Sequence, residues 1–179
     1  LEKELQNVST ACYSSYGMTE TATHIALRKI NGSNADGWYH CLENIRVSLS
    51  ADGCLQIFMP GLENQPLLTT DLAELKDEKT FRILGRIDNV IISGGIKFSP
   101  EQIEKKLETF ISEPFLISSL PHESLGQQLV LVVEGEKNKE TIEELKEICR
   151  QQLDKYEQPK QIVFVSEIPK TKNGKIDRK

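Results

Sequence analysis

The pattern of apolar residues changes character near Gly85, and this change constrains the fold more than any other feature of the sequence. Between Gly37 and Asp71 the apolar residues occur in short alternating runs, and Asp52-Gly53 separates two of these runs. Alternation with a period of two is typical of strands that bury one face, and an Asp-Gly pair between two such runs indicates a hairpin. We therefore expect a small antiparallel sheet in the first half of the chain.

The second half of the sequence combines strand-like and helix-like patterns. Short apolar runs predict strands at 89–92, 96–98, 115–120, 129–133 and 162–165. Ser99 and Pro100 form a favourable helix start, because Ser caps the first turn and Pro is tolerated at the first helical position. Apolar spacing predicts a second, amphipathic helix over 141–153. We therefore predict an α+β fold, with a β-rich part at 1–85 and a compact domain of a three-stranded sheet plus helices at 86–179.

Composition narrows the range of partners. The 22 Lys and Arg residues are outnumbered by 27 Asp and Glu residues, which gives a formal net charge of −5. This balance argues against nucleic acid or an anionic membrane as the main partner, although a small anionic ligand needs only a few local cations. No apolar run approaches the roughly 20 residues that cross a bilayer, so we expect no membrane span.

Cysteine usage and the first residues predict a cytoplasmic location. The four cysteines, Cys12, Cys41, Cys54 and Cys149, show no metal-ligand spacing, so reduced thiols are the simplest interpretation. Residues 1–7 lack the apolar core of a signal peptide.

Two short clusters in the first half have side chains suited to ligand contact. The run from Tyr16 to Glu20 offers an aromatic ring, a glycine, the hydroxyl of Thr19 and a carboxylate. A tight turn followed by a helix start explains this run equally well. In Thr69-Thr70-Asp71 an acid follows an apolar run, and a turn-capping role for Asp71 is the simpler interpretation there.

Two further clusters occupy the second half. In residues 85–104, Arg86 and Asp88 are expected to open an otherwise apolar strand, and Gly94-Gly95 would let the backbone approach a ligand closely. The basic residues 169–178 would ordinarily form an unstructured tail. Alternatively, the glycine directly before Lys175 suits a loop that brings a cation to a phosphate.

In this order and spacing, the four clusters resemble the adenylate-forming superfamily, which comprises acyl- and aryl-CoA synthetases, adenylation domains and luciferases. The resemblance runs nearly from end to end of the sequence. It implies an AMP-forming ligase that uses ATP and Mg²⁺ to adenylate a small-molecule carboxylic acid and then transfers the acyl group to coenzyme A. Residues 1–85 would be the C-terminal piece of the large adenylate-binding domain, and residues 86–179 the small mobile domain.

The resemblance also implies a role for each matching residue on the nucleotide side. Tyr16 would line the site of the adenine and ribose, and Thr19 would contact phosphate. Glu20 would help to hold Mg²⁺. Asp71 and Arg86 would hydrogen-bond the ribose hydroxyls.

On the acyl-transfer side, Asp88 matches the hinge about which the small domain rotates between the two half-reactions. Gly94 and Gly95 match the loop that lines the tunnel for the pantetheine arm of CoA. Lys175 matches the catalytic lysine of adenylation. A cation is suited to that step, because a carboxylate that attacks a phosphate brings two anions together.

The sequence departs from the family pattern in one major respect. The Ser/Thr/Gly-rich phosphate loop that precedes the Tyr-Gly-x-Thr-Glu motif is absent, as is most of the acyl pocket. We therefore expect a C-terminal fragment that is inactive alone and is completed by a missing N-terminal part. In two smaller departures, Thr70 replaces a usual glycine and Gly94 stands where some relatives carry lysine.

Within the superfamily, the sequence looks most like the o-succinylbenzoate–CoA ligases of menaquinone biosynthesis. This resemblance rests on Tyr16 to His24, on Asp88 to Ile91 and on Ser93 to Lys97. The Ser-Pro-Glu-Gln-Ile-Glu run at 99–104 looks like acyl-CoA ligases rather than peptide-synthetase adenylation domains. Two alternatives remain open: a ligase for another aryl or fatty acid, including one that loads a carrier protein, and a non-catalytic nucleotide-binding module.

Overall fold

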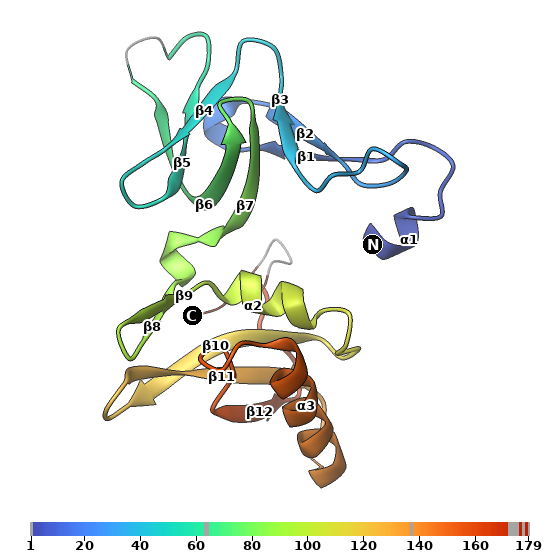
Figure 1. Cartoon of the computed structure of the whole chain (residues 1–179), viewed down its shortest axis with the longest axis vertical. Coiled ribbons are helices and arrows are strands. Elements are labelled where there is room, and N and C mark those ends of the chain that lie inside the picture. Colours follow the sequence, from blue (N-terminus) through green and yellow to red (C-terminus); the bar gives the residue numbers. More distant parts are fainter. Residues whose placement is uncertain (1, 63–64, 137, 172–175, 177, 179) are drawn as a thin grey trace. The chain divides into compact units, whose positions relative to one another are not determined.

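The structure is a computed structural model that describes residues 2–62, 65–136, 138–171, 176 and 178 (Figure 1). The chain divides into two compact units, a first unit at Leu1–Leu84 and a second unit at Gly85–Lys179. Each unit has its own sheet and its own apolar core.

Within the described residues, the first unit forms a seven-stranded sheet with the strand order β1-β2-β3-β7-β6-β5-β4. Its elements are α1 (Glu2–Leu5), β1 (Tyr13–Gly17), the 3-10 helix η1 (Thr19–Thr21), β2 (His24–Lys29), β3 (Tyr39–Cys41), β4 (Arg46–Leu49), β5 (Cys54–Phe58), β6 (Leu67–Asp77) and β7 (Thr80–Arg86). The pairs β1–β2, β2–β3, β3–β7, β4–β5 and β5–β6 are antiparallel, as the sequence predicts. The hairpin predicted at Asp52-Gly53 joins β4 to β5.

The core of the first unit gathers around Phe81 of β7, which is fully buried. Leu55 and Ile57 of β5 are also fully buried, because alternate residues of a strand face the same side of the sheet. The rings of Tyr16 and Tyr39 pack on Phe81 with centroid distances of 5.3 and 5.5 Å. The sheet therefore carries an aromatic cluster that includes one of the predicted site residues.

The second unit is built on a sheet of five strands, counted over the described part of the chain. Its elements are the 3-10 helix η2 (Ile87–Asn89), β8 (Ile91–Ser93), β9 (Ile96–Phe98), α2 (Pro100–Leu107), β10 (Phe115–His122), β11 (Gly126–Glu134), α3 (Lys139–Gln152) and β12 (Gln161–Val165). The central strand is β11, with β10 antiparallel along one edge and β12 and β8 sharing the other edge.

The prediction of a three-stranded sheet is therefore wrong. The hairpin of β8 and β9 joins the sheet through a single register pair, Gly126 with Ser93. The last strand pairs in parallel with β11, which the crossover through α3 makes possible. Both pairings join segments that are far apart in the sequence, so local periodicity does not reveal them.

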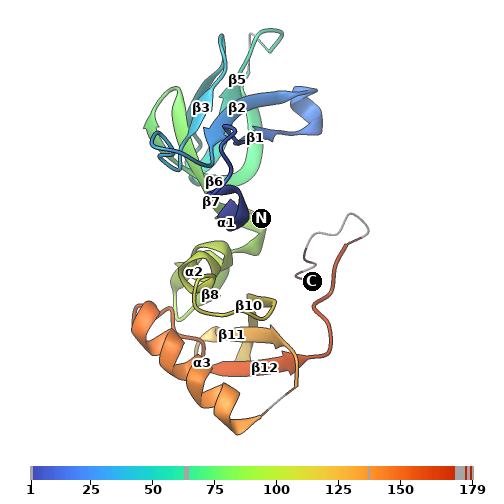
Figure 2. The ribbon, with the colours of Figure 1, turned by 90° about the vertical axis from the view of Figure 1, so that its right-hand side faces the viewer.

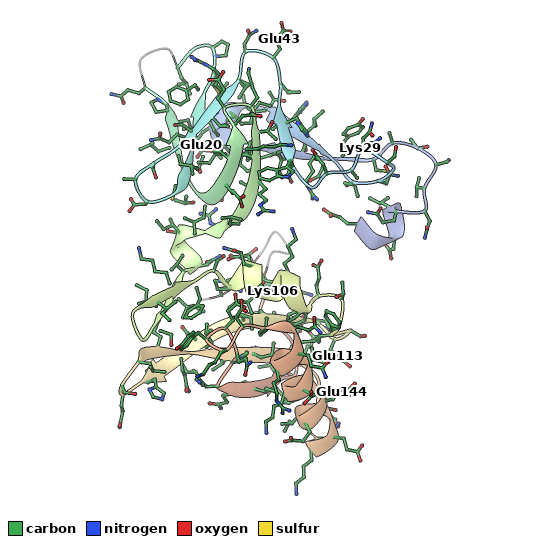
Figure 3. All side chains as sticks on the ribbon, viewed as in Figure 1. Glu20, Lys29, Glu43, Lys106, Glu113 and Glu144 are labelled. Atoms are coloured by element: carbon green, nitrogen blue, oxygen red, sulfur yellow. The ribbon has the colours of Figure 1, made fainter. Side chains whose placement is uncertain are left out.

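Both longer helices of the second unit pack into one apolar core with the sheet (Figure 2). Ile103 and Leu107 come from α2, and Leu145 and Cys149 come from α3. Lys106 of α2 (Figure 3) links this helix to the segment after α3. Its ammonium group donates hydrogen bonds of 2.8 and 2.7 Å to the two oxygens of the Glu157 carboxylate. These contacts give α2 a fixed position on the second unit.

Candidate functional site

Tyr16 and Asp71, two of the predicted site residues, meet in the first unit. They lie 55 positions apart in the sequence, and the Tyr16 hydroxyl donates a hydrogen bond of 2.6 Å to Asp71 Oδ2. Both side chains are half-buried. Asp71 lies inside β6, so the alternative that it caps a turn is wrong. The pair places an aromatic ring beside a carboxylate, and a carboxylate is suited to accept hydrogen bonds from hydroxyl groups.

The turn that follows β1 is fixed by its own backbone and by one buried hydroxyl. A side chain at Gly17 would come within 2.6 Å of the Thr23 carbonyl oxygen, so glycine allows the close approach of β1 and β2. The Thr21 hydroxyl is buried and accepts a hydrogen bond of 3.0 Å from the Met18 amide. This turn leads into η1, which the sequence predicts as a helix start.

Thr19 and Glu20 are the first two residues of η1, and both are exposed. Figure 3 labels Glu20. Over the residues that the structure describes, no cluster of three or more His, Cys, Asp or Glu side chains could hold a metal ion. Mg²⁺ is commonly bound through one or two carboxylates together with the phosphates of a substrate. One exposed glutamate beside a threonine therefore fits a magnesium–nucleotide complex better than a metal site made of protein alone.

Arg86 and Asp88 lie where β7 gives way to η2. Arg86 is the last residue of β7, and its Nη2 donates a hydrogen bond of 3.1 Å to Asp88 Oδ2. Both side chains are more than half exposed, so the pair contributes little to stability. The sequence placed these residues at the start of an apolar strand, whereas the structure places them ahead of it, at the junction.

Gly94 and Gly95 form the two-residue turn between β8 and β9. Their φ angles are +58° and +83°, which is the conformation that favours glycine at both positions of such a hairpin. The Gly94 amide donates a hydrogen bond of 3.0 Å to the Leu125 carbonyl oxygen. The turn is thereby held against the loop before β11.

Lys175, the predicted catalytic lysine, lies outside the described residues. Just after it, the chain is described at two positions: Ile176 forms an isolated antiparallel bridge with Lys170, and Arg178 binds Glu104 of α2. Arg178 is a residue that sequence reasoning missed. The sequence does contain a hint of this contact. Glu101 and Glu104 lie on one face of α2, and a nearby cation would offset the repulsion between two adjacent carboxylates.

The charges around Arg178 favour its contact with Glu104. Burial alone would lower the pKa of the Arg178 guanidinium, but its hydrogen bonds to Glu104 and the negative charges of Glu104 and Glu101 raise it above the ordinary value. Arg178 is therefore a permanent cation, and the pair persists across the whole pH range in which the carboxylates are ionised.

Comparison with known proteins identifies relatives of this chain. Residues 117–175 match the family model of the AMP-binding enzyme C-terminal domain. A 2-succinylbenzoate–CoA ligase of Listeria monocytogenes is 30% identical over 92% of this chain and 39% of its own length. A long-chain-fatty-acid–CoA ligase of Mycobacterium tuberculosis is 33% identical over 65% of this chain and 23% of its own length.

Solved structures show the same fold. The o-succinylbenzoate–CoA synthetase of Bacillus subtilis in complex with its acyl-adenylate intermediate has a TM-score of 0.79 at 20% identity, over 99% of this chain and 42% of that one. The ATP-bound MatB of Rhodopseudomonas palustris has a TM-score of 0.76 at 22% identity, over 94% and 39% of the two chains. At these identities the likeness concerns the fold alone.

The chain belongs to the adenylate-forming superfamily and corresponds to its C-terminal region. It spans about two fifths of the length of the curated 2-succinylbenzoate–CoA ligases that it matches. Among the helices that the structure describes, none is both long enough and apolar enough to cross a membrane.

Proposed function

We propose that this chain is the C-terminal part of an AMP-forming acid–CoA ligase. In the first half-reaction a carboxylate oxygen attacks the α-phosphorus of ATP and pyrophosphate leaves. In the second, the sulfur of CoA attacks the acyl carbon and AMP leaves. The observation that carries the proposal is the 2.6 Å hydrogen bond between Tyr16 and Asp71, in a chain of the adenylate-forming superfamily.

The first unit would be the C-terminal piece of the large adenylate-binding domain. Tyr16 would present its ring to the adenine and ribose, while Asp71 and Arg86 would hydrogen-bond the ribose hydroxyls. Thr19 would donate to a phosphate oxygen, and Glu20 would help to hold Mg²⁺. The metal, when bound, would offset the negative charge that builds on the phosphate oxygens.

The second unit would be the small mobile domain. Lys175 would bring its ammonium group to the reacting phosphate during adenylation, and Asp88 would be the hinge of the rotation that withdraws it. Gly94 and Gly95 would line the tunnel for the pantetheine arm during thioester formation. Two residues without side chains beyond Cα suit a position where a narrow ligand passes close to backbone.

We further propose o-succinylbenzoate as the acid. This is supported by the 2-succinylbenzoate–CoA ligases of Listeria and Bacillus mycoides, which match more than nine tenths of this chain at 29–31% identity. A fatty acid is the second candidate, because the long-chain-fatty-acid–CoA ligase of Mycobacterium tuberculosis is 33% identical over 65% of the chain.

The test uses the full-length enzyme with ATP, Mg²⁺ and CoA, offered either o-succinylbenzoate or a long-chain fatty acid. AMP release and the thioester product are followed together, the latter by mass. The proposal expects the o-succinylbenzoyl thioester. A fatty-acyl thioester alone would keep the ligase and replace the acid, AMP without thioester would indicate another acceptor, and no AMP with any acid would contradict the proposed function.

A further inference from the structure

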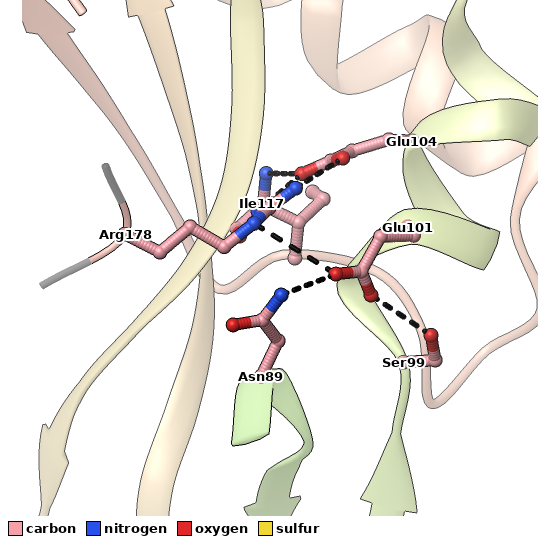
Figure 4. A network of polar contacts seen from close by, with 6 residues as sticks. All are labelled: Asn89, Ser99, Glu101, Glu104, Ile117 and Arg178. Atoms are coloured by element: carbon pink, nitrogen blue, oxygen red, sulfur yellow. Dashed lines mark hydrogen bonds and ion pairs between the residues drawn. The ribbon is translucent and has the colours of Figure 1, made fainter. Parts of the chain in front are cut away.

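Arg178 is held by two elements of the second unit (Figure 4). Its Nη1 and Nη2 each donate a hydrogen bond of 2.7 Å to a different oxygen of the Glu104 carboxylate in α2. Nη1 also donates a hydrogen bond of 3.0 Å to the carbonyl oxygen of Ile117 in β10. The guanidinium is thereby attached both to a helix side chain and to strand backbone.

The carboxylates around Arg178 are themselves held in place (Figure 4). Glu104 Oε1 accepts a hydrogen bond of 2.7 Å from the Ile117 amide. Glu101 Oε1 lies 3.9 Å from Arg178 Nε, and the Glu101 carboxylate also accepts hydrogen bonds from Asn89 and from Ser99. Ser99 is the N-cap residue of α2, as predicted, but its hydroxyl donates to Glu101 and makes no capping bond.

This arrangement differs from an ordinary surface ion pair. The side chains of Arg178 and Glu104 are each only 17% exposed, whereas those of Arg150 and Glu147 on α3 are 64% and 47% exposed. A two-point contact of a planar guanidinium with a carboxylate fixes orientation as well as distance, which a lysine cannot do. Arg178 and Glu104 also lie 74 positions apart, so their contact fixes one segment of chain on another.

We propose that Arg178 is a positioning residue, which anchors the segment that carries Lys175 to α2 and β10 so that Lys175 moves with the second unit. The inference rests on the proposed function, because it takes Lys175 as the lysine of adenylation. Lys175 precedes Arg178 by three positions, and three residues of chain reach at most about 11 Å. Under the proposal, a fixed Arg178 would lower the entropy lost when the ammonium group of this lysine meets the phosphate.

The test compares Arg178→Gln and Arg178→Lys in the full-length enzyme, with Arg150→Gln as the matched control in an exposed pair. The first half-reaction is measured as acid-dependent exchange of pyrophosphate into ATP, and the second as thioester formation from preformed acyl-adenylate and CoA. We expect Arg178→Gln to lower the exchange rate at least tenfold and to leave thioester formation within twofold of the unmodified enzyme. Arg178→Lys should fall in between, and Arg150→Gln should leave both rates unchanged.

Two outcomes would overturn the inference: exchange by Arg178→Gln at the unmodified rate, or an equal loss of both half-reactions. Hydrogen–deuterium exchange of the peptide 169–179 tests the anchor without any chemistry, and it should be faster in Arg178→Gln but not in Arg150→Gln. If the unmodified enzyme shows no pyrophosphate exchange with any acid, the proposed function fails. Faster hydrogen exchange in Arg178→Gln would then still support the anchor, and unchanged hydrogen exchange would refute it.

Discussion

In the first unit, Tyr16 and Asp71 lie on strands of one sheet, and backbone hydrogen bonds and an aromatic core hold both strands. In the second unit, Arg178 lies beyond the last strand, and side-chain contacts with α2 together with one carbonyl oxygen hold it. The side chains with proposed functions are thus held differently: by a sheet in the first unit, and by an ion-pair network of Arg178 with Glu101 and Glu104 in the second unit.

This difference predicts how each unit responds to the loss of a single side-chain contact. A strand is supported at many points, so the loss of one side-chain hydrogen bond should leave Asp71 close to its position. Arg178 is held through its side chain, so the loss of one carboxylate should release it. Under the proposed function, the sheet would hold the residues that bind the nucleotide, whereas the Arg178 anchor would hold a segment whose cation is brought in and withdrawn.

The largest expected effect concerns the core of the first unit. Replacing Phe81 by Ala removes a fully buried ring that packs on Tyr16 and Tyr39, and it should cost about 3–5 kcal/mol in the free energy of unfolding. Urea unfolding followed by the fluorescence of Trp38 measures the loss in this unit. Tyr13→Ala is the matched control, because that ring lies in the same unit and is 55% exposed. Equal effects of the two changes would contradict the assigned core.

The next effect separates the two proposed half-reactions. Lys175→Ala in the full-length enzyme should slow adenylation by about 10²–10³, which is the usual cost of removing one group that stabilises transition-state charge. Thioester formation from preformed acyl-adenylate should proceed at the unmodified rate, because the proposed mechanism withdraws the lysine before that step. Rapid-quench measurement of each half-reaction checks this. An equal loss of both steps would show that one state of the second unit serves both.

A smaller effect is expected at the ion-pair network. Glu104→Gln removes the charged group that accepts two hydrogen bonds from Arg178, whose side chain is only 17% exposed. This should cost about 1–3 kcal/mol in the free energy of unfolding. Glu147→Gln, in the exposed pair on α3, should cost at most about 0.5 kcal/mol. Thermal unfolding of the two variants compares them, and similar losses would mean that burial adds nothing to the Arg178 contact.

On the sheet, the corresponding change should matter less. Tyr16→Phe keeps the ring on Phe81 but removes the 2.6 Å hydrogen bond to Asp71. The expected loss is about 0.5–1.5 kcal/mol. Tyr13→Phe on the same strand is the control, since Tyr13 is 55% exposed. A loss at Tyr16 greater than that of Glu104→Gln would reverse the comparison between the two units.

The smallest effect concerns two thiols, one in each unit. Burial raises the pKa of Cys41 and of Cys149 to about 11. Because the folded-state pKa exceeds the unfolded value of about 8.5, the resulting stability is complete below about pH 8.5 and is lost as the pH rises to about 11. At pH 8 the thiolate fraction is about 0.1%. Iodoacetamide at pH 8 should therefore label both cysteines slowly in the folded chain and quickly in urea, and equally fast labelling in both states would refute their burial.

Much of the fold follows from local sequence pattern. The hairpin at Asp52-Gly53 and the strand at 115–120 were predictable, because alternation of apolar residues and turn residues are properties of a short stretch. The five-stranded sheet was not, because β8 meets β11 at one register pair and β12 joins it in parallel after a helix. Such pairings depend on contacts between distant segments, which periodicity does not encode.

The candidate site, too, could be predicted from the sequence only in part. The motif residues Tyr16 and Asp71 were identified from the sequence, but their hydrogen bond depends on the strand order, which places β1 and β6 in one sheet. Arg178 was missed because its partner lies 74 positions away on α2. Two carboxylates on one face of α2, Glu101 and Glu104, indicate that a basic side chain lies near them, but they do not indicate which one.

The most direct test of the proposed function is the structure of the full-length enzyme with a non-hydrolysable acyl-adenylate analogue. The account predicts that the Asp71 carboxylate and the Arg86 guanidinium lie within about 2.6–3.2 Å of the ribose hydroxyls, with the Tyr16 ring against the adenine or ribose. A nucleotide bound elsewhere, with Asp71 still held by Tyr16 and no ligand atom near it, would contradict the account.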